Sequence, residues 1–429
     1  PLPIPAREKD RPTFMSEPAK ESVVRAPGIP HLLVTVLFCF SGFALLLPAS
    51  PAWAVEGGAD AFGAGLVTAV LMAATVLTQL FVRTALRGLG WTRTLALGAL
   101  LLGLPSLLQA LSDGLPPVLL TTALRGAGFG IVTVCGATAA AVLAPRGRQG
   151  AVIGLYGLAV ALPQVVLTPA APWLTDTFAL PAVIACGVLP VLALPWVRSL
   201  GHAVEARTDG AASPGAPARS PASAGTVLRR IRRPLGVLLL VTAAGGAVLT
   251  FAPQFTATPA LAATGLLALT ATAALARWGC GELADRIALR PITGILALSA
   301  CSGLALIASA VGSDRAPVLL AGLLLLGAAY GGLQSLTLVQ AFDHAGAENR
   351  HATSVAWNIG YDAGTGLGSL MLGVAAQVAT FSAGFTVLAA LLALAGLAVL
   401  LTGHPRPADP PGSGGTRTPG TKRPSLGKR

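Results

Sequence analysis

The sequence predicts an all-α membrane protein with twelve transmembrane helices in two pseudo-symmetric six-helix bundles. Twelve apolar segments of about 18–27 residues follow one another along the chain. About 20 helical residues at a rise of 1.5 Å each are enough to cross a hydrocarbon core of about 30 Å. Charged residues make up only 11% of the chain, against about 25% in soluble domains.

Each expected span lies between a basic segment at one end and a connection with few basic residues at the other. In the first half the spans are 31–52, 62–82, 94–111, 117–143, 150–172 and 179–197. In the second half they are 235–255, 259–276, 292–311, 317–341, 352–377 and 382–403. Because lipid cannot pair with backbone polar groups, each span is expected to be a helix.

The Lys and Arg residues fix the expected orientation. Of 29 such residues, 27 lie in segments on one side of the threading path. These segments are 1–30, 83–93, 144–149, 198–234, 277–291, 342–351 and 404–429. Since short basic loops stay in the cytoplasm, both termini are expected there. The connections on the other side carry only Glu56, Asp60, Asp113, Asp176, Asp314 and Arg315.

The net charge of +12 resides in tails and loops, where anionic lipid headgroups are the natural neighbours. It therefore does not indicate a nucleic-acid partner. Arg strongly outnumbers Lys, and Ala and Gly are abundant. This composition is typical of a GC-rich bacterial genome, so the expected location is the bacterial plasma membrane.

The chain divides into two halves at a low-complexity segment. Residues 201–225 are rich in Ala, Ser, Pro and Gly, and the basic run Arg229-Arg230-Ile231-Arg232-Arg233 follows. This pattern favours a flexible linker with a basic anchor for the seventh span. The expected divisions are a cytoplasmic tail (1–30), an N-terminal bundle (31–199), a disordered basic linker (200–234), a C-terminal bundle (235–403) and a disordered basic tail (404–429).

The two halves resemble each other at an offset of 201 residues. Gly126-Ala127-Gly128-Phe129-Gly130 corresponds to Gly327-Ala328-Ala329-Tyr330-Gly331, and Pro116 corresponds to Pro317. Leu155-Tyr156-Gly157 corresponds in the same way to Ala356-Trp357-Asn358. A six-plus-six repeat is a known transporter architecture with its site near mid-membrane between the halves.

The loop after the eighth span reads Gly281-Glu282-Leu283-Ala284-Asp285-Arg286-Ile287-Ala288-Leu289-Arg290. It resembles the signature loop of the major facilitator superfamily, Gly-x-Leu-Ala-Asp-Arg-x-Gly-x-Arg, with Ala288 at the second glycine. The resemblance implies a gate formed by Gly281, Asp285, Arg286 and Arg290. In such a gate the aspartate caps a nearby helix N-terminus and latches one conformation. The copy after the second span keeps only Gly90 and Arg93.

Two further elements bear on the kind of transporter. Arg125-Gly126-Ala127-Gly128-Phe129-Gly130 is similar to the Arg-x-x-x-Gly element of proton-coupled members. The antiporter element of the fifth span survives only as Gly157, Pro163 and Pro169, which weakens the case for drug antiport. The resemblance covers essentially residues 31–403 and implies a similarity to bacterial proton-coupled efflux permeases.

Only Arg125 and Asp362 place formal charges deep within the expected spans. Arg125 lies roughly 12 Å from the outer face and Asp362 roughly 15 Å from the inner face. Gly360, Gly364 and Gly368 form a small-residue stripe on the face opposite Asp362, so that face is expected to pack and Asp362 to face a polar space. Two readings stay open: Asp362 and Arg125 couple transport to protons, or they form a permanent pair that locks the halves together.

The remaining candidates are polar or aromatic residues expected to line the cavity. They are Tyr156, Gln164, Tyr330, Gln334, Trp357, Asn358 and Tyr361. The five cysteines have no ligand-like spacing, and neither a metal nor another cofactor is expected.

The expected function is secondary active transport of a small organic molecule by a monomer, with export driven by proton entry. The alternative is an uptake permease for a small nutrient or metabolite. A membrane enzyme would need a His/Asp/Glu or Ser/His cluster near an interface, and the sequence shows none. A non-transporting sensor should carry a folded cytoplasmic domain, for which the expected loops are too short.

The first span has an alternative interpretation as a secretory signal cleaved at Ala52-Trp53-Ala54. Removing it would leave eleven spans with the wrong parity for the basic loops. Met15 begins a plausible start, which makes residues 1–14 candidates for an untranslated segment.

The orientation can be tested with single cysteines and an impermeant thiol reagent. Cysteines at Gly58 and Ser313 are expected to react in intact cells because their connections face outward. Cysteines at Ser213 and Ser413 are expected to react only after permeabilisation. Reaction of the Ser213 cysteine in intact cells would contradict the two-bundle topology.

Overall fold

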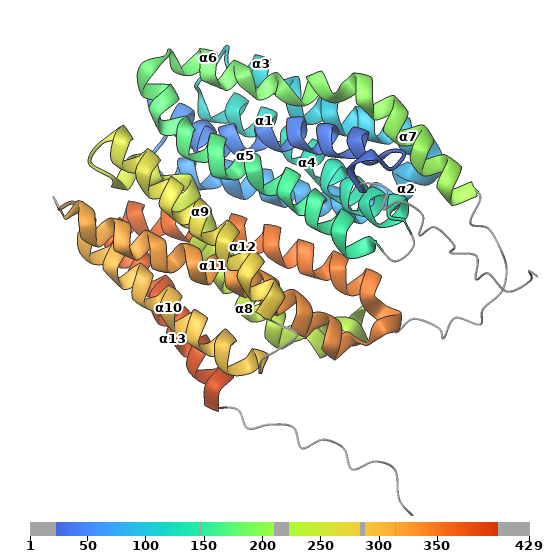
Figure 1. Cartoon of the computed structure of the whole chain (residues 1–429). Helices are drawn as coiled ribbons and strands as arrows, with labels where there is room; N and C mark the ends of the chain where they lie inside the picture. Colours follow the sequence, from blue (N-terminus) through green and yellow to red (C-terminus); the bar gives the residue numbers. More distant parts are fainter. Residues whose placement is uncertain (1–22, 146–147, 210–222, 284–287, 314, 402–429) are drawn as a thin grey trace, which may run out of the picture.

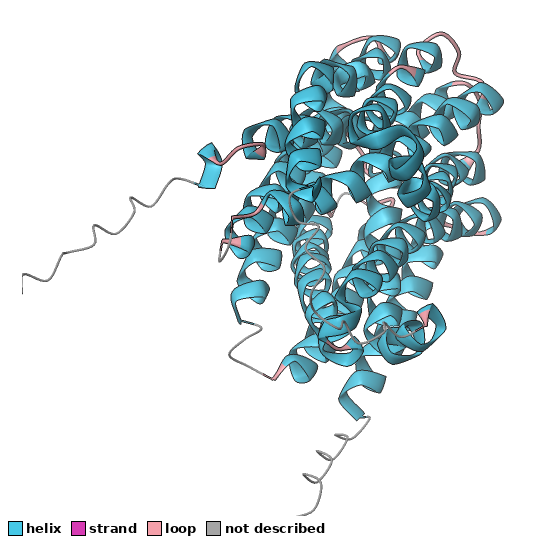
Figure 2. Cartoon of the chain, turned by 90° about the vertical axis from the view of Figure 1, so that its right-hand side faces the viewer, coloured by secondary structure: helices cyan, strands magenta, loops and turns pink. Residues whose placement is uncertain are grey.

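The computed structural model describes residues 23–145, 148–209, 223–283, 288–313 and 315–401, which are almost entirely helical and contain no strand (Figures 1 and 2). The first half contains η1 (Val23–Arg25), α1 (Ile29–Glu56), α2 (Ala61–Gly103), α3 (Pro105–Gln109), α4 (Leu115–Leu143), α5 (Gln149–Thr177), α6 (Leu180–Ala185), η2 (Cys186–Ala193) and α7 (Leu194–Asp209). The second half contains α8 (Ala224–Phe255), α9 (Pro259–Leu283), α10 (Leu289–Ala310), α11 (Ala316–Ala345), η3 (Ala347–Asn349), α12 (Arg350–Val378) and α13 (Phe381–Leu401).

The predicted twelve-helix path is confirmed. Ten helical segments of the described chain are long and apolar enough to cross a membrane. One of them, Ala61–Gln109, covers the second expected span and all but the last two residues of the third. The expected eleventh span is α12, which is not among the ten and which carries Asn358, Tyr361 and Asp362. The described helices therefore supply all twelve expected crossings.

The break between the second and third spans is a single residue. Gly90 has φ 78° and ψ 174°, which is non-helical backbone that favours glycine. The helix that restarts at Trp91 is capped from a distance, because the Trp91 backbone N–H donates to Glu205 Oε1 of α7 at 3.1 Å. The expectation that 83–93 would form a loop is wrong, since the chain stays helical up to this break.

The expected irregular linker over 200–234 is wrong at both ends. Helix α7 continues to Asp209 and α8 begins at Ala224, while residues 210–222 lie outside the described ranges. The first turns of α8 are held because Val227 and Ile231 are buried against Ala341 and Ala345 at the end of α11. Burial of these two apolar side chains, one turn apart, stabilises the helix although the residues around them are polar.

The N-terminal bundle (α1–α7) and the C-terminal bundle (α8–α13) lie side by side, as the blue-green and yellow-red halves of Figure 1 show. Their internal packing follows the predicted repeat. A Cβ on Gly126 or Gly130 of α4 would meet backbone carbonyl oxygens of α2. A Cβ on Gly327 or Gly331 of α11 would meet backbone carbonyl oxygens of α9 in the same way. Equivalent glycines therefore set equivalent helix contacts in the two bundles.

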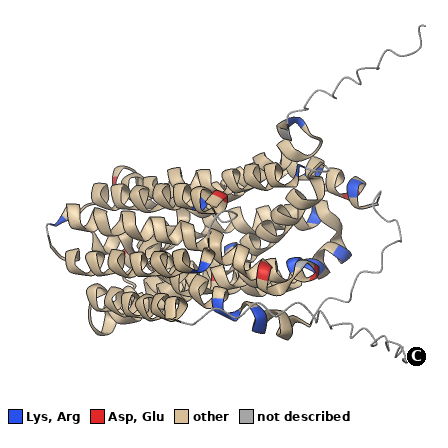
Figure 3. Cartoon of the chain, turned by 60° about the horizontal axis from the view of Figure 1, so that its bottom comes forward, with Lys and Arg blue, Asp and Glu red and all other residues tan. Residues whose placement is uncertain are grey.

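Most described Lys and Arg residues gather at one end of the helices (Figure 3). We call this the basic end; α1 begins there and α2 reaches Gly90 there. The far end is the one at which α1 ends with Glu56 and α2 begins with Ala61.

The two bundles are in close contact where α2 meets α12. Toward the far end, a Cβ on Gly65 would lie 2.5 Å from the Ser369 carbonyl oxygen. Thr250 of α8 donates to Thr68 of α2 at 3.0 Å, and its hydroxyl also lies 2.8 Å from the Ser369 hydroxyl. Toward the basic end, a Cβ on Gly154 of α5 would have no atom within 4 Å. The bundles are thus tightly packed away from the basic end, while α5 is sparsely packed close to it.

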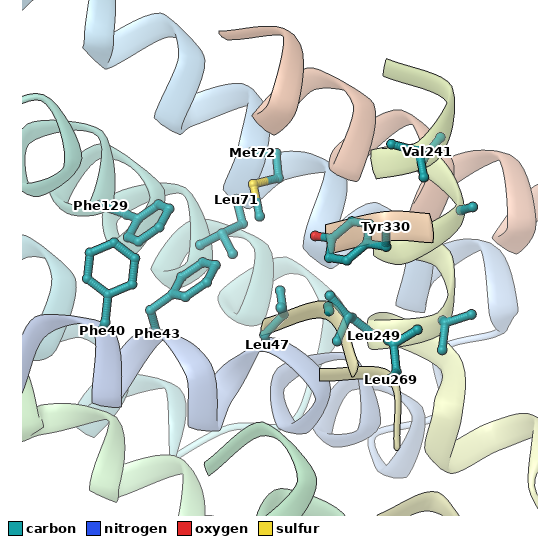
Figure 4. Close-up of a cluster of buried hydrophobic side chains, with 14 of the residues drawn as sticks. Phe40, Phe43, Leu47, Leu71, Met72, Phe129, Val241, Leu249, Leu269 and Tyr330 are labelled. Atoms are coloured by element: carbon teal, nitrogen blue, oxygen red, sulfur yellow. The ribbon is translucent and has the colours of Figure 1, made fainter. Parts of the chain in front are cut away.

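Aromatic packing fills the interior of the N-terminal bundle, where Figure 4 shows Phe40, Phe43 and Phe129 side by side. The rings of Phe43 and Phe129 are stacked, with centroids 3.9 Å apart and planes within 3°. Phe129 lies one turn from Arg125 on α4, so this stack helps to fix the helix that carries the buried arginine.

The glycine stripe of α12 is a packing surface, as predicted. A Cβ on Gly364 would overlap Thr242 Oγ1 and would lie 2.6 Å from the Leu239 carbonyl oxygen, both on α8. Gly360 and Gly368 also lie against α8.

Gly364→Leu is therefore expected to separate α12 from α8 and to lower the free energy of unfolding by about 1–3 kcal/mol or more. Thermal unfolding in detergent measures this loss. Gly154→Leu is the matched control, because its side chain would enter open space. An unchanged melting temperature for Gly364→Leu, or an equal loss in both variants, would contradict the packing role.

Candidate functional site

Asp362 is buried at the contact between the bundles. It lies on the α12 face away from the glycine stripe, and its side chain is 5% exposed. Gln79 of α2 donates its Nε2–H to Asp362 Oδ2 at 2.7 Å. The same amide nitrogen lies 3.4 Å from Thr133 Oγ1 of α4. The carboxyl group of the C-terminal bundle is therefore held by a neutral amide of the N-terminal bundle.

A chain of aromatic side chains lies beside Asp362. The hydroxyls of Tyr330 on α11 and Tyr361 on α12 are 2.6 Å apart. Trp357 stacks on Tyr361 at 5.8 Å between centroids, and its indole N–H donates to Thr337 at 3.2 Å. Both tyrosines interact electrostatically with Asp362. Four of the predicted residues are thus brought together in one place.

The N-terminal bundle contributes Tyr156 of α5 to this region. Its hydroxyl would lie 3.3 Å from a Cβ on Gly136 of α4. Arg277 of α9 interacts electrostatically with Tyr156, and also with Tyr330 and Tyr361. The tyrosines of both bundles therefore lie within electrostatic range of the same arginine.

Within the described part of the chain, three predicted cavity residues make no side-chain hydrogen bond to the cluster of Asp362 and the tyrosines. Gln164 donates to the Val160 carbonyl oxygen of its own helix at 3.2 Å, and Asn358 donates to the Ser354 carbonyl oxygen at 2.9 Å. Gln334 is 3% exposed within α11, one turn from Tyr330. These contacts are the ordinary ones for a polar side chain in a transmembrane helix.

Arg125 belongs to a different cluster. It is 1% exposed, and its Nη1–H donates to Ser50 Oγ at 3.0 Å and to Gln109 Oε1 at 3.4 Å. Ser50 and Gln109 lie near the far ends of α1 and α3. The predicted pairing of Arg125 with Asp362 is therefore wrong for this structure, because each has neutral partners of its own.

The predicted gate is only partly described. Gly281 lies in the last turn of α9, and Arg290 at the start of α10 donates its Nε–H to the Val399 carbonyl oxygen at 2.8 Å. Asp285 and Arg286 lie outside the described residues. The latch therefore stays a prediction.

Sequence reasoning missed two residues of the site. Gln79 is an amide in an apolar span, and the same criterion that selected Gln164 and Gln334 would have selected it. Arg277 was assigned to a basic loop because the expected span ended at residue 276, whereas α9 continues to Leu283. Within the described ranges, no group of three or more His, Cys, Asp or Glu side chains is placed to hold a metal ion.

The charged form of Asp362 is costly to bury where the structure places it. Burying a charge near mid-membrane costs at least about 2.5–3.5 kcal/mol on insertion scales. One hydrogen bond to a charged group returns about 1.5–3 kcal/mol. No cation among the described residues contributes to the balance at this carboxyl group. A proton on the carboxyl group, or water beside it, would remove most of this cost.

Two helical bundles with polar side chains at their contact are an architecture of membrane transporters. A family model described as the Major Facilitator Superfamily matches residues 32–369. The chain belongs to this superfamily.

Solved structures share the fold at low sequence identity. The nucleoside transporter NupG is 12% identical, with a TM-score of 0.70 over 87% of this chain and 99% of that one. The peptide transporter POT, in complex with sulfate, is 14% identical, with a TM-score of 0.66 over 87% and 94%. The xylose transporter XylE from E. coli, in a partially occluded inward-open conformation, is 15% identical, with a TM-score of 0.65 over 87% and 96%. No curated protein matches the chain.

A double-mutant cycle tests the separation of the two buried charges. Because Arg125 and Asp362 share no partner, the losses in unfolding free energy from Arg125→Leu and Asp362→Leu are expected to add within about 0.5 kcal/mol. Thermal unfolding in detergent gives the four values. A coupling above about 1 kcal/mol, or restored expression in the double variant, would instead support a paired lock.

Proposed function

We propose that the protein exports a small organic molecule in exchange for protons, by alternating access to the site between its bundles. The proposal rests on one observation: a buried acid of one bundle bonds to a neutral amide of the other. Asp362 moves with the C-terminal bundle and Gln79 with the N-terminal bundle. A change in the charge of Asp362 therefore acts directly on the contact that alternating access must break.

The direction of this effect follows from the energies of the buried acid. Protonated Asp362 is compatible with the enclosed arrangement, so low pH favours the conformation described here. Deprotonation leaves a buried charge whose cost exceeds what the Gln79 hydrogen bond returns, so high pH favours a conformation in which water reaches the carboxylate. Proton binding and release then drive the exchange between the two conformations.

The aromatic residues are proposed to line the substrate cavity, with Tyr156 on one side and Tyr330, Trp357 and Tyr361 on the other. Gln164, Gln334 and Asn358 are proposed as lesser contributors. Asp285 and Arg286, with Gly281 and Arg290, are proposed as the gate. Arg125 is proposed to hold the far end of the N-terminal bundle through Ser50 and Gln109 and not to exchange protons itself.

The basic end is proposed to face the bacterial cytoplasm, because short basic loops are retained there. The structure would then be the inward-facing form of a monomer. At this end Arg229, Arg230, Arg232, Arg233 and His344 line a hollow of about 310 Å³. We propose that anionic lipid headgroups contact this hollow, in keeping with the attraction of cytoplasmic headgroups for basic segments.

Uptake of a small nutrient or metabolite is the second candidate. Its support is that the similar structures named above are a nucleoside, a peptide and a xylose transporter. Export is preferred on the resemblance of Arg125–Gly130 to the element of proton-coupled permeases, although the antiporter element is eroded. Screening everted vesicles against a compound library with a pH-sensitive dye would separate the two directions.

Asp362→Asn tests the coupling without knowledge of the substrate. Spin labels on cysteines at Gly154 of α5 and Gly279 of α9, in a background without the native cysteines, report the separation of the bundles at the basic end. We expect the distance distribution of the parent protein to change between acidic and alkaline pH, because Asp362 titrates. In Asp362→Asn the distribution is expected to be independent of pH, since an amide cannot titrate.

Gln79→Leu is the matched control, because it removes the contact across the bundles but keeps the titrating group. It should retain a pH response with a shifted midpoint. A full pH response in Asp362→Asn would refute the role of this residue in coupling.

A further inference from the structure

Arg277 is a cation on α9, a helix that packs against α11 of its own bundle and against α5 of the other bundle. It lies on α9 one residue beyond the expected end of the eighth span, and its side chain is exposed. It interacts electrostatically with Tyr156 on α5, Tyr330 on α11 and Tyr361 on α12. The charge of Arg277 therefore acts on tyrosines of three helices that belong to both bundles.

No acid neutralises this cation within the described part of the chain. The Ser335 hydroxyl donates to the Arg277 backbone carbonyl at 2.7 Å, and this bond leaves the guanidinium itself unused. Asp362 interacts with Tyr330 and Tyr361 but is bonded to Gln79. With Asp362 protonated, this group of side chains therefore carries one positive charge and several hydroxyl donors.

The donor types present define a ligand chemistry. A guanidinium presents its N–H groups in a planar fork that matches carboxylate and phosphate oxygens. Tyr330 and Tyr361 form a bonded hydroxyl pair that can turn a proton toward an added acceptor. The stacked rings of Trp357 and Tyr361 offer an apolar face beside these donors.

We propose that the transported molecule is an organic anion with an apolar or aromatic body, whose acid group binds Arg277 beside the Tyr330–Tyr361 pair. The proposal rests on the transport function proposed above and names its substrate class. A basic residue that only fixed topology would have no need to lie within electrostatic range of tyrosines of both bundles. Lys would also serve such a role, whereas a forked contact with an acid group requires Arg.

The test compares acids with neutral isosteres on the purified full-length protein. Benzoate, salicylate and phenyl phosphate are the acid probes, and benzamide and salicylamide are the neutral ones. Thermal unfolding in detergent at millimolar probe gives the stabilisation, from which an apparent Kd follows. We expect at least one acid to stabilise the protein, and its amide counterpart to have at least about tenfold weaker affinity.

Arg277→Gln is expected to weaken acid binding by about tenfold or more, while leaving the melting temperature without ligand unchanged. Arg277→Lys should retain part of the affinity. Arg207→Gln, which changes an exposed arginine at the end of α7, is the control and should bind as the parent does. Equal binding of acids and amides, undiminished binding in Arg277→Gln, or no stabilisation by any acid would each overturn the proposal.

This binding measurement is independent of energy coupling. Acid binding that requires Arg277, found together with a pH-insensitive bundle separation, would refute proton coupling and leave anion recognition standing. Acid binding that does not require Arg277, found together with a pH-sensitive bundle separation, would refute the proposed substrate class and leave proton coupling standing.

Discussion

Close approach between helix backbones is the constraint on which the rest of this structure depends. In lipid the hydrophobic effect does not draw helices together, so their association relies on van der Waals contact at small residues. Helix α12 has glycines on two of its faces: Gly364 and Gly368 lie against α8, and Gly366 and Gly373 lie against α2. A single helix of the C-terminal bundle is thereby pressed against the N-terminal bundle.

The position of Asp362 follows from this packing. Because the glycine faces fix the rotation of α12, the carboxyl group is directed at α2, where Gln79 meets it. The tyrosines and Trp357 occupy the neighbouring positions on α11 and α12. The polar site is therefore a product of apolar packing, and any change that rotates α12 would move the acid, the aromatic rings and the bundle contact together.

The sequence allowed the fold to be predicted more fully than the site. Length, hydropathy and basic loops determine where the spans lie, and a four-residue glycine spacing shows one face on which α12 packs. The face that carries Asp362 was expected to meet a polar space, and this was wrong, because Gly366 lets it pack against α2. The partner of Asp362 was beyond reach, because it depends on which helix of the other bundle lies opposite. Arg125 was predicted to pair with Asp362 only because their charges are opposite. In the structure the Arg125 guanidinium instead donates hydrogen bonds to Ser50 and Gln109. The helical ends of the linker were missed because composition conceals short apolar contacts such as that of Ile231.

The one-residue break at Gly90 divides α2 into two helical segments joined at a kink. The first part of α2, Ala61 to Leu89, meets α12 at the bundle contact, and the second part begins at Trp91 with its backbone held by Glu205 of α7. Because the break is a single residue, Gly90 alone joins the two parts of the helix. A tilt of the first part of α2, where Gln79 contacts Asp362, would therefore also move the second part and the Trp91–Glu205 contact with α7. Helix α7 leads into the connection between the two halves.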